Sequence, residues 1–492
     1  MRMELLMHPD DARHVSRIRR AFKTAETRPR TRRVRLFLHD TPDHALTATG
    51  LALIERRGAW RIERLSPGAT IWAPATPAPV LEEATTREGL TTPLPEGLAP
   101  VAIIEGQETT HTLLVNGQTA VLTIWRGSAH AAPVPQTPDP GFPLCRIMLD
   151  GPEAAVRLLA VQVAATARAE APRASLATEA LSLVSDSAYR PRRSGAPSLP
   201  REDASDLTSG SAFRHILGHL VDVLLYLAPF VVNATEDTEP VHQMRVAVRR
   251  ARSAITVFQG VIGGEESRVA ADHLKVLGAR LGPTRDWDVF VTETLPEVTV
   301  AIPGNKRLLR LCDAAEAIRK AHASDLRAYL TGGDFRVLGV ELAWLAAAEG
   351  WVANHDTHSI SLPDFATQVL QRRWRKLTRA GKTIEGLDIP ALHDLRLRTK
   401  RARYSAEVFV SLYPGHRTTR YLRRLGRLQQ HLGVLNDGAV AAQLLDELGG
   451  AGGRHAHACG LVLGFAAARA ATVRPDILQA WEKFRHTSRF WG

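Results

Sequence analysis

The stretch VHQMRVAVRRARSAITVF, residues 241–258, decides how the chain is organised, because residues 392–409 repeat it as LHDLRLRTKRARYSAEVF. The two copies keep their polar and basic residues at a constant offset of 151 residues. The matched pairs are His242 and His393, Arg245 and Arg396, Arg249 and Lys400, Arg250 and Arg401, Arg252 and Arg403, and Phe258 and Phe409. The offset continues from LGPTRDWDV at Leu281 to LGVLNDGAV at Leu432. A register that holds this far indicates one duplicated unit.

Each copy predicts an amphipathic helix with two neighbouring stripes. At about 100° per residue, one arc of the first copy is apolar and should face the core, with Val241, Met244, Val248, Ala251, Ile255 and Phe258. A second stripe lies beside it and consists of His242, Arg245, Arg249 and Arg252. A cationic stripe that adjoins the buried side lies near helix contacts. We therefore expect one composite polyanion site, in which this stripe faces His393, Arg396, Lys400 and Arg403, with Arg250 and Arg401 beside the stripes as further candidates.

A run of arginines on a helix is often only a solvated face whose aliphatic stems cover apolar neighbours, and this interpretation fits either copy alone. Solubility can be met by any mixture of Lys, Glu, Gln or Ser. Both copies instead place the same cations beside the same histidine, with almost no acids between them. The repetition therefore favours a binding function over solubility.

The two HxxRxxx(R/K)RxR helices, each followed about 40 residues later by an LGxxxD segment, resemble the CHAD domain, the conserved-histidine α-helical module. The resemblance spans residues 205–492 and rests on two motifs repeated in register. It implies an all-α domain of two pseudo-twofold helical-bundle repeats, at about 205–340 and 341–492. It also implies a basic surface that binds inorganic polyphosphate or related polyanions without catalysis.

Composition limits the class of protein and its partners. The chain has 492 residues, 45% of them hydrophobic and 23% charged, which is enough for two or three domains with proper cores. Its formal charge of +12 favours anionic partners: polyphosphate, nucleic acid or an acidic membrane surface. Cys145, Cys312 and Cys459 are scattered and odd in number, which indicates neither a disulfide framework nor a CxxC metal site. We expect no signal peptide and no membrane span, and therefore a cytoplasmic protein.

The first 185 residues have the pattern of an antiparallel sheet with helices, an α+β domain. Strand-like runs begin at Arg32, Gly50 and His111, and Asn116-Gly117 predicts a tight hairpin turn.

Other segments of this part should not be strands. Residues 8–22 and 151–171 have helical patterns, and the second begins with a proline suited to a first turn. Residues 74–100 contain too many prolines for a strand and are expected to form a surface excursion. Residues 186–204 carry Pro, Ser and Arg with few apolar residues, which predicts a linker between domains 1–185 and 205–492.

FLHDTPDHALTATGLAL, from Phe37, resembles the DTPDxxLxxxG segment of the CYTH triphosphate-tunnel family, and CYTH followed by CHAD is a familiar order. The likeness implies a tunnel-like or barrel-like antiparallel sheet. The family's ExExK strand keeps one acid here, and its RxR and later Lys positions are mostly lost. The residues at these positions are Arg2, Glu4, Leu6, Ile54, Arg56 and Leu65.

These losses bear on catalysis. Hydrolysis of triphosphate in a tunnel needs carboxylates that hold a divalent metal and several cations that neutralise the phosphoryl oxygens. A lone Glu4 with Arg56 cannot assemble such a site. We therefore interpret the domain as a degenerate CYTH-like fold and expect no catalytic residues, no cofactor and no catalysis. An inorganic triphosphatase is the alternative enzyme hypothesis.

The second half of the chain is helical almost throughout, and its basic residues extend beyond the repeated helices. The apolar stretch from Phe213 holds Arg214 and Asp222 in its first half, so it should be a buried bundle helix and not a membrane span. Cations on other helices are further candidates for phosphate contact, although some of them only solubilise exposed faces. These candidates are Arg280, Arg285, Arg372, Arg375, Lys376, Arg379, Arg423, Arg424 and Arg427.

Asp286 and Asp437 stand at matching positions of the LGxxxD segments. A symmetric two-carboxylate metal site is not expected, because Asp288 has an alanine as its counterpart. Pairing of each aspartate with an arginine of the basic helix, or helix capping, is the better interpretation. His242 and His393 lack the spacing of zinc ligands, so we interpret them as phosphate donors when protonated. Satisfied bundle histidines are the alternative.

The sequence thus predicts binding of inorganic polyphosphate by basic helices, in the cytoplasm and associated with polyphosphate granules. Nucleic-acid or nucleotide-phosphate binding is the main alternative, because the same field attracts any phosphate backbone. The basic helices lack regularly interleaved aromatics for base stacking, since Trp374, Tyr404 and Tyr421 are isolated. Polyphosphate is therefore the preferred partner.

Overall fold

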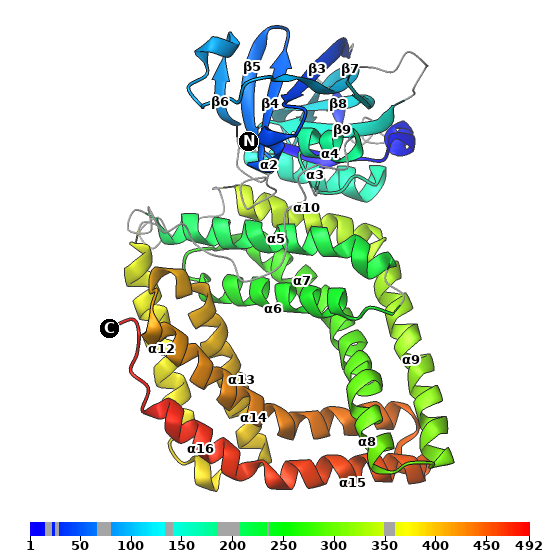
Figure 1. Cartoon of the computed structure of the whole chain (residues 1–492), viewed down its shortest axis with the longest axis vertical. Helices are drawn as coiled ribbons and strands as arrows, with labels where there is room; N and C mark the ends of the chain where they lie inside the picture. Colours follow the sequence, from blue (N-terminus) through cyan, green and yellow to red (C-terminus); the bar gives the residue numbers. More distant parts are fainter. Residues whose placement is uncertain are drawn as a thin grey trace.

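The chain forms a curled sheet with helices, followed by a frame of long helices (Figure 1). This agrees with the predicted order of an α+β part and an all-α part. The computed structural model describes residues 1–14, 22–24, 29–65, 80–132, 141–172, 174–184, 207–233, 236–348 and 360–492.

The sheet is antiparallel throughout. Its strands are β1 (Arg2–Leu6), β2 (Lys23–Thr24), β3 (Arg30–Asp40), β4 (Leu51–Arg56), β5 (Ala59–Arg64), β6 (Val80–Ala84), β7 (Ala99–Val115), β8 (Gln118–Ala131) and β9 (Phe142–Asp150). Eight of them follow one path in the order β1-β9-β8-β7-β3-β4-β5-β6, and β2 pairs with β7. A curled antiparallel sheet of this order is compatible with a CYTH-like tunnel.

The predicted hairpin at Asn116-Gly117 joins β7 and β8. Both turn residues have positive φ angles, 50° and 80°, as a two-residue hairpin loop requires. One prediction for this part is wrong: residues 74–100 were expected to lack strands, but Val80–Ala84 forms the edge strand β6 on β5. This run contains no proline, so its backbone groups can pair, while the neighbouring residues 66–79 lie outside the described part.

The DTPD segment follows β3 and has a structural role. Asp40 is buried, and its carboxylate accepts hydrogen bonds from the backbone amides of Leu46 and Thr47 at 2.8 and 2.9 Å. It thereby holds the short helix α2 (Ala45–Ala48) against the sheet. A carboxylate bound to several amides at a helix start stabilises the local backbone.

Helices cover both faces of the sheet. They are η1, a 3-10 turn (Pro9–His14), α3 (Glu153–Ala167) and α4 (Leu176–Val184). Alternation along β8 separates the faces: Leu122 belongs to the cluster that contains α3, and Trp125 to the cluster that contains α4. The helix predicted within residues 151–171 is confirmed. The one predicted at 8–22 begins as a 3-10 turn, and residues 15–21 lie outside the described part.

The second part of the chain is built from helices, as predicted. They are α5 (Ser209–Asn233), α6 (Glu239–Val257), α7 (Gly264–Val289), a π-helical turn η4 (Phe290–Thr294), α8 (Leu295–Ala301), α9 (Lys306–Leu330), α10 (Gly333–Ala347), α12 (Leu362–Ala380), α13 (Ile389–Val408), α14 (His416–Glu447), α15 (Ala456–Thr472) and α16 (Arg474–Arg485). At the 151-residue offset, α5, α6 and α7 correspond to α12, α13 and α14. In Figure 1, α5 and α6 form one side of the frame, and α14 and α15 the opposite side.

The core between the repeats confirms the predicted apolar arc of α6, because all six of its residues are buried. Phe258, directly after α6, lies with its ring centroid 6.0 Å from that of its matched residue Phe409. It also contacts Phe213 and Phe365, the latter with stacked rings 5.0 Å apart. Two matched residues can touch only near the axis that relates the repeats, so this cluster lies close to the pseudo-twofold axis.

Helix α10 connects the two parts of the molecule. The Arg157 guanidinium of α3 donates two hydrogen bonds to Glu341 of α10, at 2.8 and 3.0 Å, and lies over the Trp344 ring. One continuous apolar cluster runs from the sheet through α3 and α10 to α5. The predicted linker, 186–204, lies outside the described residues, and the division into separate domains stays a prediction.

Helix α5 is long and apolar enough to cross a membrane, and so are α15 and α16 when they are taken together as one helix with a 42° bend. Most of α5 is buried between α6 and α10, including Asp222. This position agrees with the buried bundle helix that the sequence predicts.

Candidate anion-binding site

The two repeated basic helices, α6 and α13, pack against each other. The Arg249 guanidinium of α6 lies 4.5 Å from the centroid of the Tyr404 ring of α13. Next to this contact, a guanidinium nitrogen of Arg250 in α6 lies 3.8 Å from a carboxylate oxygen of Glu407 in α13. The helices therefore meet in their second halves, close to the phenylalanine core.

This packing brings four cations together, and we call them the central cation cluster: Arg245, Arg249, Arg396 and Lys400. Burial, with a smaller contribution from the charges of Arg396, Arg249 and Arg245, lowers the pKa of Lys400 to about 8. Burial also lowers the pKa of Arg396, and Arg245 of the other repeat adds to that effect. Cations from both repeats thus act on one another, as the composite site requires.

The first repeat neutralises part of this charge. Arg245 donates to the Asp286 carboxylate at 2.6 Å and to the Gly282 carbonyl at 3.2 Å. The predicted pairing of Asp286 with an arginine of the basic helix is therefore confirmed, and Asp286 lies inside α7 and not at a cap. In the second repeat, Asp437 attracts Arg396 electrostatically, but its side chain is exposed.

The cluster has unsatisfied donors. The Nε atoms of Arg249 and Arg396 are buried and have no hydrogen-bond partner. A buried donor without an acceptor costs about 1–3 kcal/mol, and crowded like charges add to that cost. An anion whose oxygens reach these donors would remove both penalties.

The histidines lie further from the crossing. His242 stands seven residues before Arg249, which is about 10 Å along the helix axis. Burial lowers its pKa, and the charge of Arg285 acts in the same direction. The matched His393 is exposed. The middle of each stripe therefore forms the cluster, and the histidines flank it.

Several predicted cations have protein partners. Arg250 and Arg403 pair with Glu407, Arg280 lies over Tyr329 and 3.6 Å from Asp325, Arg285 pairs with Glu293, and Arg424 donates to the Lys483 carbonyl and to Thr487. These contacts give the five arginines structural roles. Four others are exposed on their helices: Arg252, Arg401, Arg423 and Arg427.

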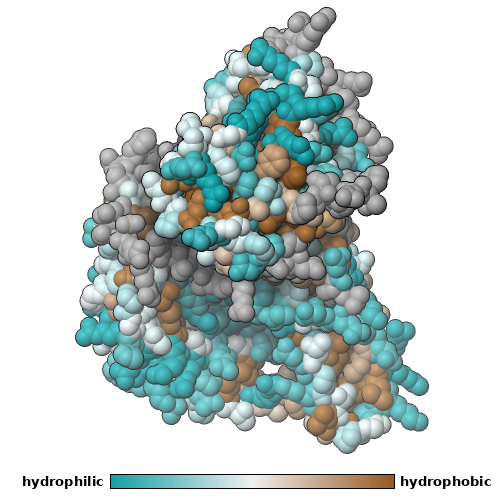
Figure 2. Space-filling model, turned by 45° about the horizontal axis from the view of Figure 1, so that its top comes forward, coloured by the Kyte–Doolittle hydropathy of each residue, from teal (hydrophilic) through white to brown (hydrophobic). Residues whose placement is uncertain are grey.

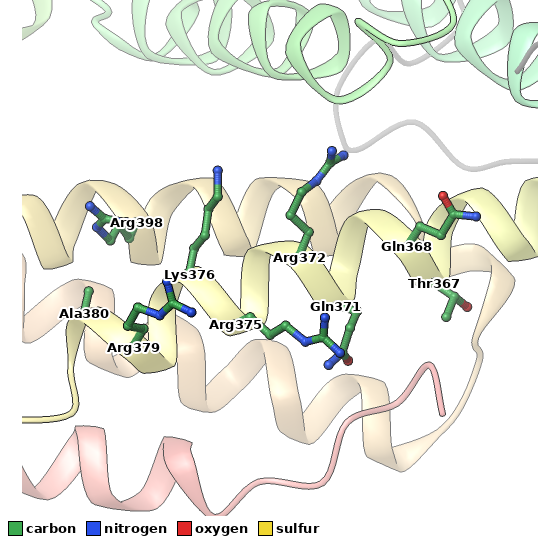
Figure 3. A pocket seen from close by; sticks show the side chains of 9 residues that line it. All are labelled: Thr367, Gln368, Gln371, Arg372, Arg375, Lys376, Arg379, Ala380 and Arg398. Atoms are coloured by element: carbon green, nitrogen blue, oxygen red, sulfur yellow. The ribbon is translucent and has the colours of Figure 1, made fainter.

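A separate set of cations lines a groove of about 800 Å³ along α12, which we call the α12 groove. Figure 3 shows side chains of α12 along it, with Arg398 contributed by α13. Its cations are Arg372, Arg375, Lys376, Arg379 and Arg398. In the space-filling view, the helical part is hollowed beside the N-terminal part, and hydrophilic residues line the hollow (Figure 2).

Three residues of these surfaces escaped the sequence analysis as site residues. Tyr404 was interpreted only as an isolated aromatic, yet it supports Arg249. Arg373 is half-buried, and burial and Arg372 lower its pKa. Arg398 lines the α12 groove. The matched residue of Tyr404 is Ser253, so the repeat comparison held no signal for it.

In the N-terminal part, Glu4 is buried and held by a cation. Arg146 of β9 donates to Glu4 at 2.7 Å and to Glu179 of α4, and it is itself buried. Burial raises the pKa of Glu4, while Arg146 opposes this rise. Among the residues that the structure describes, no group of three His, Cys, Asp or Glu side chains could hold a metal ion.

Comparisons with known proteins place the helical part in a family. The model of the CHAD domain matches residues 215–446. The crystal structure of the CHAD domain from the plant Ricinus communis is 30% identical, covers 61% of this chain and 98% of its own, and has a TM-score of 0.51. PptA from Streptomyces chartreusis is 16% identical over 56% of this chain and all of its own, with a TM-score of 0.43.

Among curated proteins, an uncharacterized protein of Mycobacterium tuberculosis, present in two strains, is 30% identical over 181 residues. The match spans 34% of this chain and only about a third, 34%, of the length of these relatives. Together with the repeated basic helices and their pseudo-twofold packing, the family match and the Ricinus communis structure show that this chain belongs to the CHAD domain family.

Proposed function

We propose that this protein binds inorganic polyphosphate at the central cation cluster. The observation that carries the proposal is the convergence of Arg245, Arg249, Arg396 and Lys400 from two repeats, with two buried guanidinium donors left unsatisfied. A phosphate chain offers oxygens along its whole length and can accept from both repeats at once. Arginine donates to such oxygens in a bidentate way, and lysine adds a compact charge. The link of CHAD domains to polyphosphate supports this ligand.

Nucleic acid is the less favoured ligand for the same surface. Tyr404, the aromatic ring of the cluster, is buried beneath Arg249 and does not offer a face to a base. Single-stranded nucleic acids usually stack their bases on exposed aromatic rings. The cluster therefore suits a ligand that consists of phosphate alone.

We further propose that the N-terminal part has no triphosphatase activity. The sheet face that carries Glu4 is covered by α4, whose Ala177, Ala180 and Leu181 pack with Ile54. A metal–triphosphate complex would have to displace this apolar contact and compete with Arg146 for Glu4. Phosphate release from triphosphate, with magnesium or manganese, should not exceed that of a Glu4→Ala variant. Release above that control would restore the triphosphatase hypothesis.

Calorimetric titration of long-chain polyphosphate tests the binding proposal. A double variant, Arg249→Gln with Lys400→Gln, should lose roughly 3 kcal/mol or more of binding free energy, because each lost charge-assisted contact contributes about 1.5–3 kcal/mol. A matched variant, Lys306→Gln with Arg310→Gln, removes two exposed charges of α9 and should bind almost like wild type. Equal binding by both folded variants would reject the cluster as the site.

We propose that binding places the protein on polyphosphate granules in the cytoplasm. A fluorescent fusion should then gather on stained granules, and the double variant at Arg249 and Lys400 should stay diffuse. A variant that still gathers would separate granule localisation from this site.

A further inference from the structure

The first helices of the two repeats, α5 and α12, have different surfaces at matching positions. In α5 these positions are buried, and Leu225 packs on α10, where a Cβ at Gly339 would lie 3.2 Å from it. The α5 residues are Val221, Leu224, Leu225 and Ala228. In α12 the same positions are exposed cations: Arg372, Arg375, Lys376 and Arg379.

The α12 groove therefore concentrates positive charge. Arg398 is paired with Asp394 at 2.6 Å, but no carboxylate of the described chain lies within ion-pair distance of the four α12 cations. Like charges three and four residues apart repel and weaken a helix. A face that only needed to be soluble would include acids, so this excess indicates an anionic ligand.

The side chains of the α12 groove favour a phosphate chain over a nucleic acid as the ligand. Trp374 is covered by the Arg489 guanidinium, 5.1 Å from its ring centroid, and the Gln371 amide oxygen accepts from Arg489 at 2.8 Å. The groove thus lacks an open aromatic face of its own for stacking a base. From Arg372 to Arg379 the cations extend over about 10 Å of helix axis, which suits several successive phosphates.

The α12 groove is distinct from the central cation cluster. Helix α13 lies between them and contributes to both, with Arg396 and Lys400 on one side and Arg398 on the other. The charges that lower the pKa of Lys400 all come from the cluster, whereas Arg373 responds to Arg372 and to Arg401. Figure 3 shows Arg372 and Lys376 extending from α12 away from Arg375.

We propose that the α12 groove is a second site for a polyphosphate chain, which lies along α12 while another part of the same chain occupies the central cation cluster. The identity of the ligand rests on the proposed function. Once one site holds the chain, the second site meets it at high effective concentration. Long chains therefore bind more tightly than short ones, which reach one site at a time.

The test compares two triple variants by calorimetry at several salt concentrations, after circular dichroism shows that each is folded. The groove variant carries Arg372→Gln, Arg375→Gln and Lys376→Gln. The control carries the same loss of three exposed cations on α9, Lys306→Gln, Arg307→Gln and Arg310→Gln. The groove variant should bind long-chain polyphosphate about tenfold more weakly than the control. The slope of log K against the logarithm of the salt concentration should be smaller in magnitude by about 2 for the groove variant than for the control. Tripolyphosphate, bound at the central cluster, should bind both variants alike.

The outcomes separate the two proposals. If the groove variant matches the α9 control at every chain length, the groove inference is overturned and the central site stands. If the Arg249 and Lys400 double variant binds every chain like wild type while the groove variant loses binding, the central proposal fails and the groove is supported. If the groove variant no longer binds single-stranded DNA but binds polyphosphate as the control does, the groove is a site for nucleic acid and the groove inference is overturned.

Discussion

Arg245 and Arg396 occupy matching positions of α6 and α13 but have different surroundings. Arg245 is held by Asp286 at 2.6 Å, whereas Asp437, at the matching position, is exposed and the Nε of Arg396 is buried without an acceptor. The first helices differ in the same direction at four matching positions, which are buried in α5 and are exposed cations in α12. At these matching positions the first repeat pairs or buries its side chains, whereas the second leaves a cation exposed or a donor unsatisfied. A motif position alone does not fix the role of a cation; its partners do.

The largest expected difference between the repeats is in stability. Leu225→Lys should lower the free energy of unfolding by about 3–5 kcal/mol, because it buries a charge against α10. The reciprocal change at the matching position, Lys376→Leu, should stay within about 0.5 kcal/mol, because that side chain is exposed. Urea unfolding followed by circular dichroism measures both. Similar losses would show that the two faces are equally covered.

The next difference is in ligand affinity. Arg396→Gln should cost about 1.5–3 kcal/mol of binding to long-chain polyphosphate, because it removes an uncompensated donor from a partly buried cluster. Arg245→Gln should cost less, since Asp286 already neutralises Arg245. Calorimetry on the two variants decides the order. A larger loss at Arg245 would contradict the proposed division between the repeats.

Lys400 and its matched residue Arg249 should differ in their response to pH. Folding lowers the Lys400 pKa from 10.5 to about 8, so the unfolded chain binds more protons between these values and stability should rise with pH across that window. Binding has the opposite sign: the anion needs the protonated amine, so affinity should fall by up to about tenfold per pH unit above 8. Lys400→Arg should remove both trends. Binding and unfolding measured from pH 7 to about 10 test this, and an unchanged slope in the variant would assign the proton to another group.

The smallest difference concerns the two aspartates. Asp286→Asn should strengthen polyphosphate binding at low salt by about 0.5 kcal/mol, because it releases Arg245 from its partner. Asp437→Asn should change binding less, because that carboxylate is exposed. The comparison is made by titration at low and high salt. Stronger binding that persists at high salt would point to a structural change and not to a released charge.

Much of this organisation was predictable from local patterns. The apolar arc of α6, the turn at Asn116-Gly117 and the pairing of Asp286 each follow from spacing within a few residues or from the repeat. The repeat also predicted that Arg249 and Lys400 would meet, because duplicated helices pack around a shared axis.

Other features depend on contacts that no local pattern contains. Helix α4 lies on the sheet face that carries Glu4 because its apolar residues join a cluster with Ile54 and Trp125, which are more than 50 residues away in the sequence. The separation of the α12 groove from the central cluster depends on which side of α13 each residue faces. The roles of Arg280 and Arg424 depend on partners far along the chain, Tyr329 and Lys483.

Helix α10 has a consequence for how the protein behaves in solution. It lies between α3 and α5, with the Glu341 carboxylate buried and satisfied by Arg157 and with the Trp344 indole bonded to the Glu153 carbonyl at 3.1 Å. A fragment cut back to the helical part would expose this apolar face to water and leave Glu341 without its counter-charge. Exposed apolar area of this kind promotes self-association. The N-terminal part therefore covers this apolar face of the helical part, and we expect it to keep the whole chain from self-associating in solution.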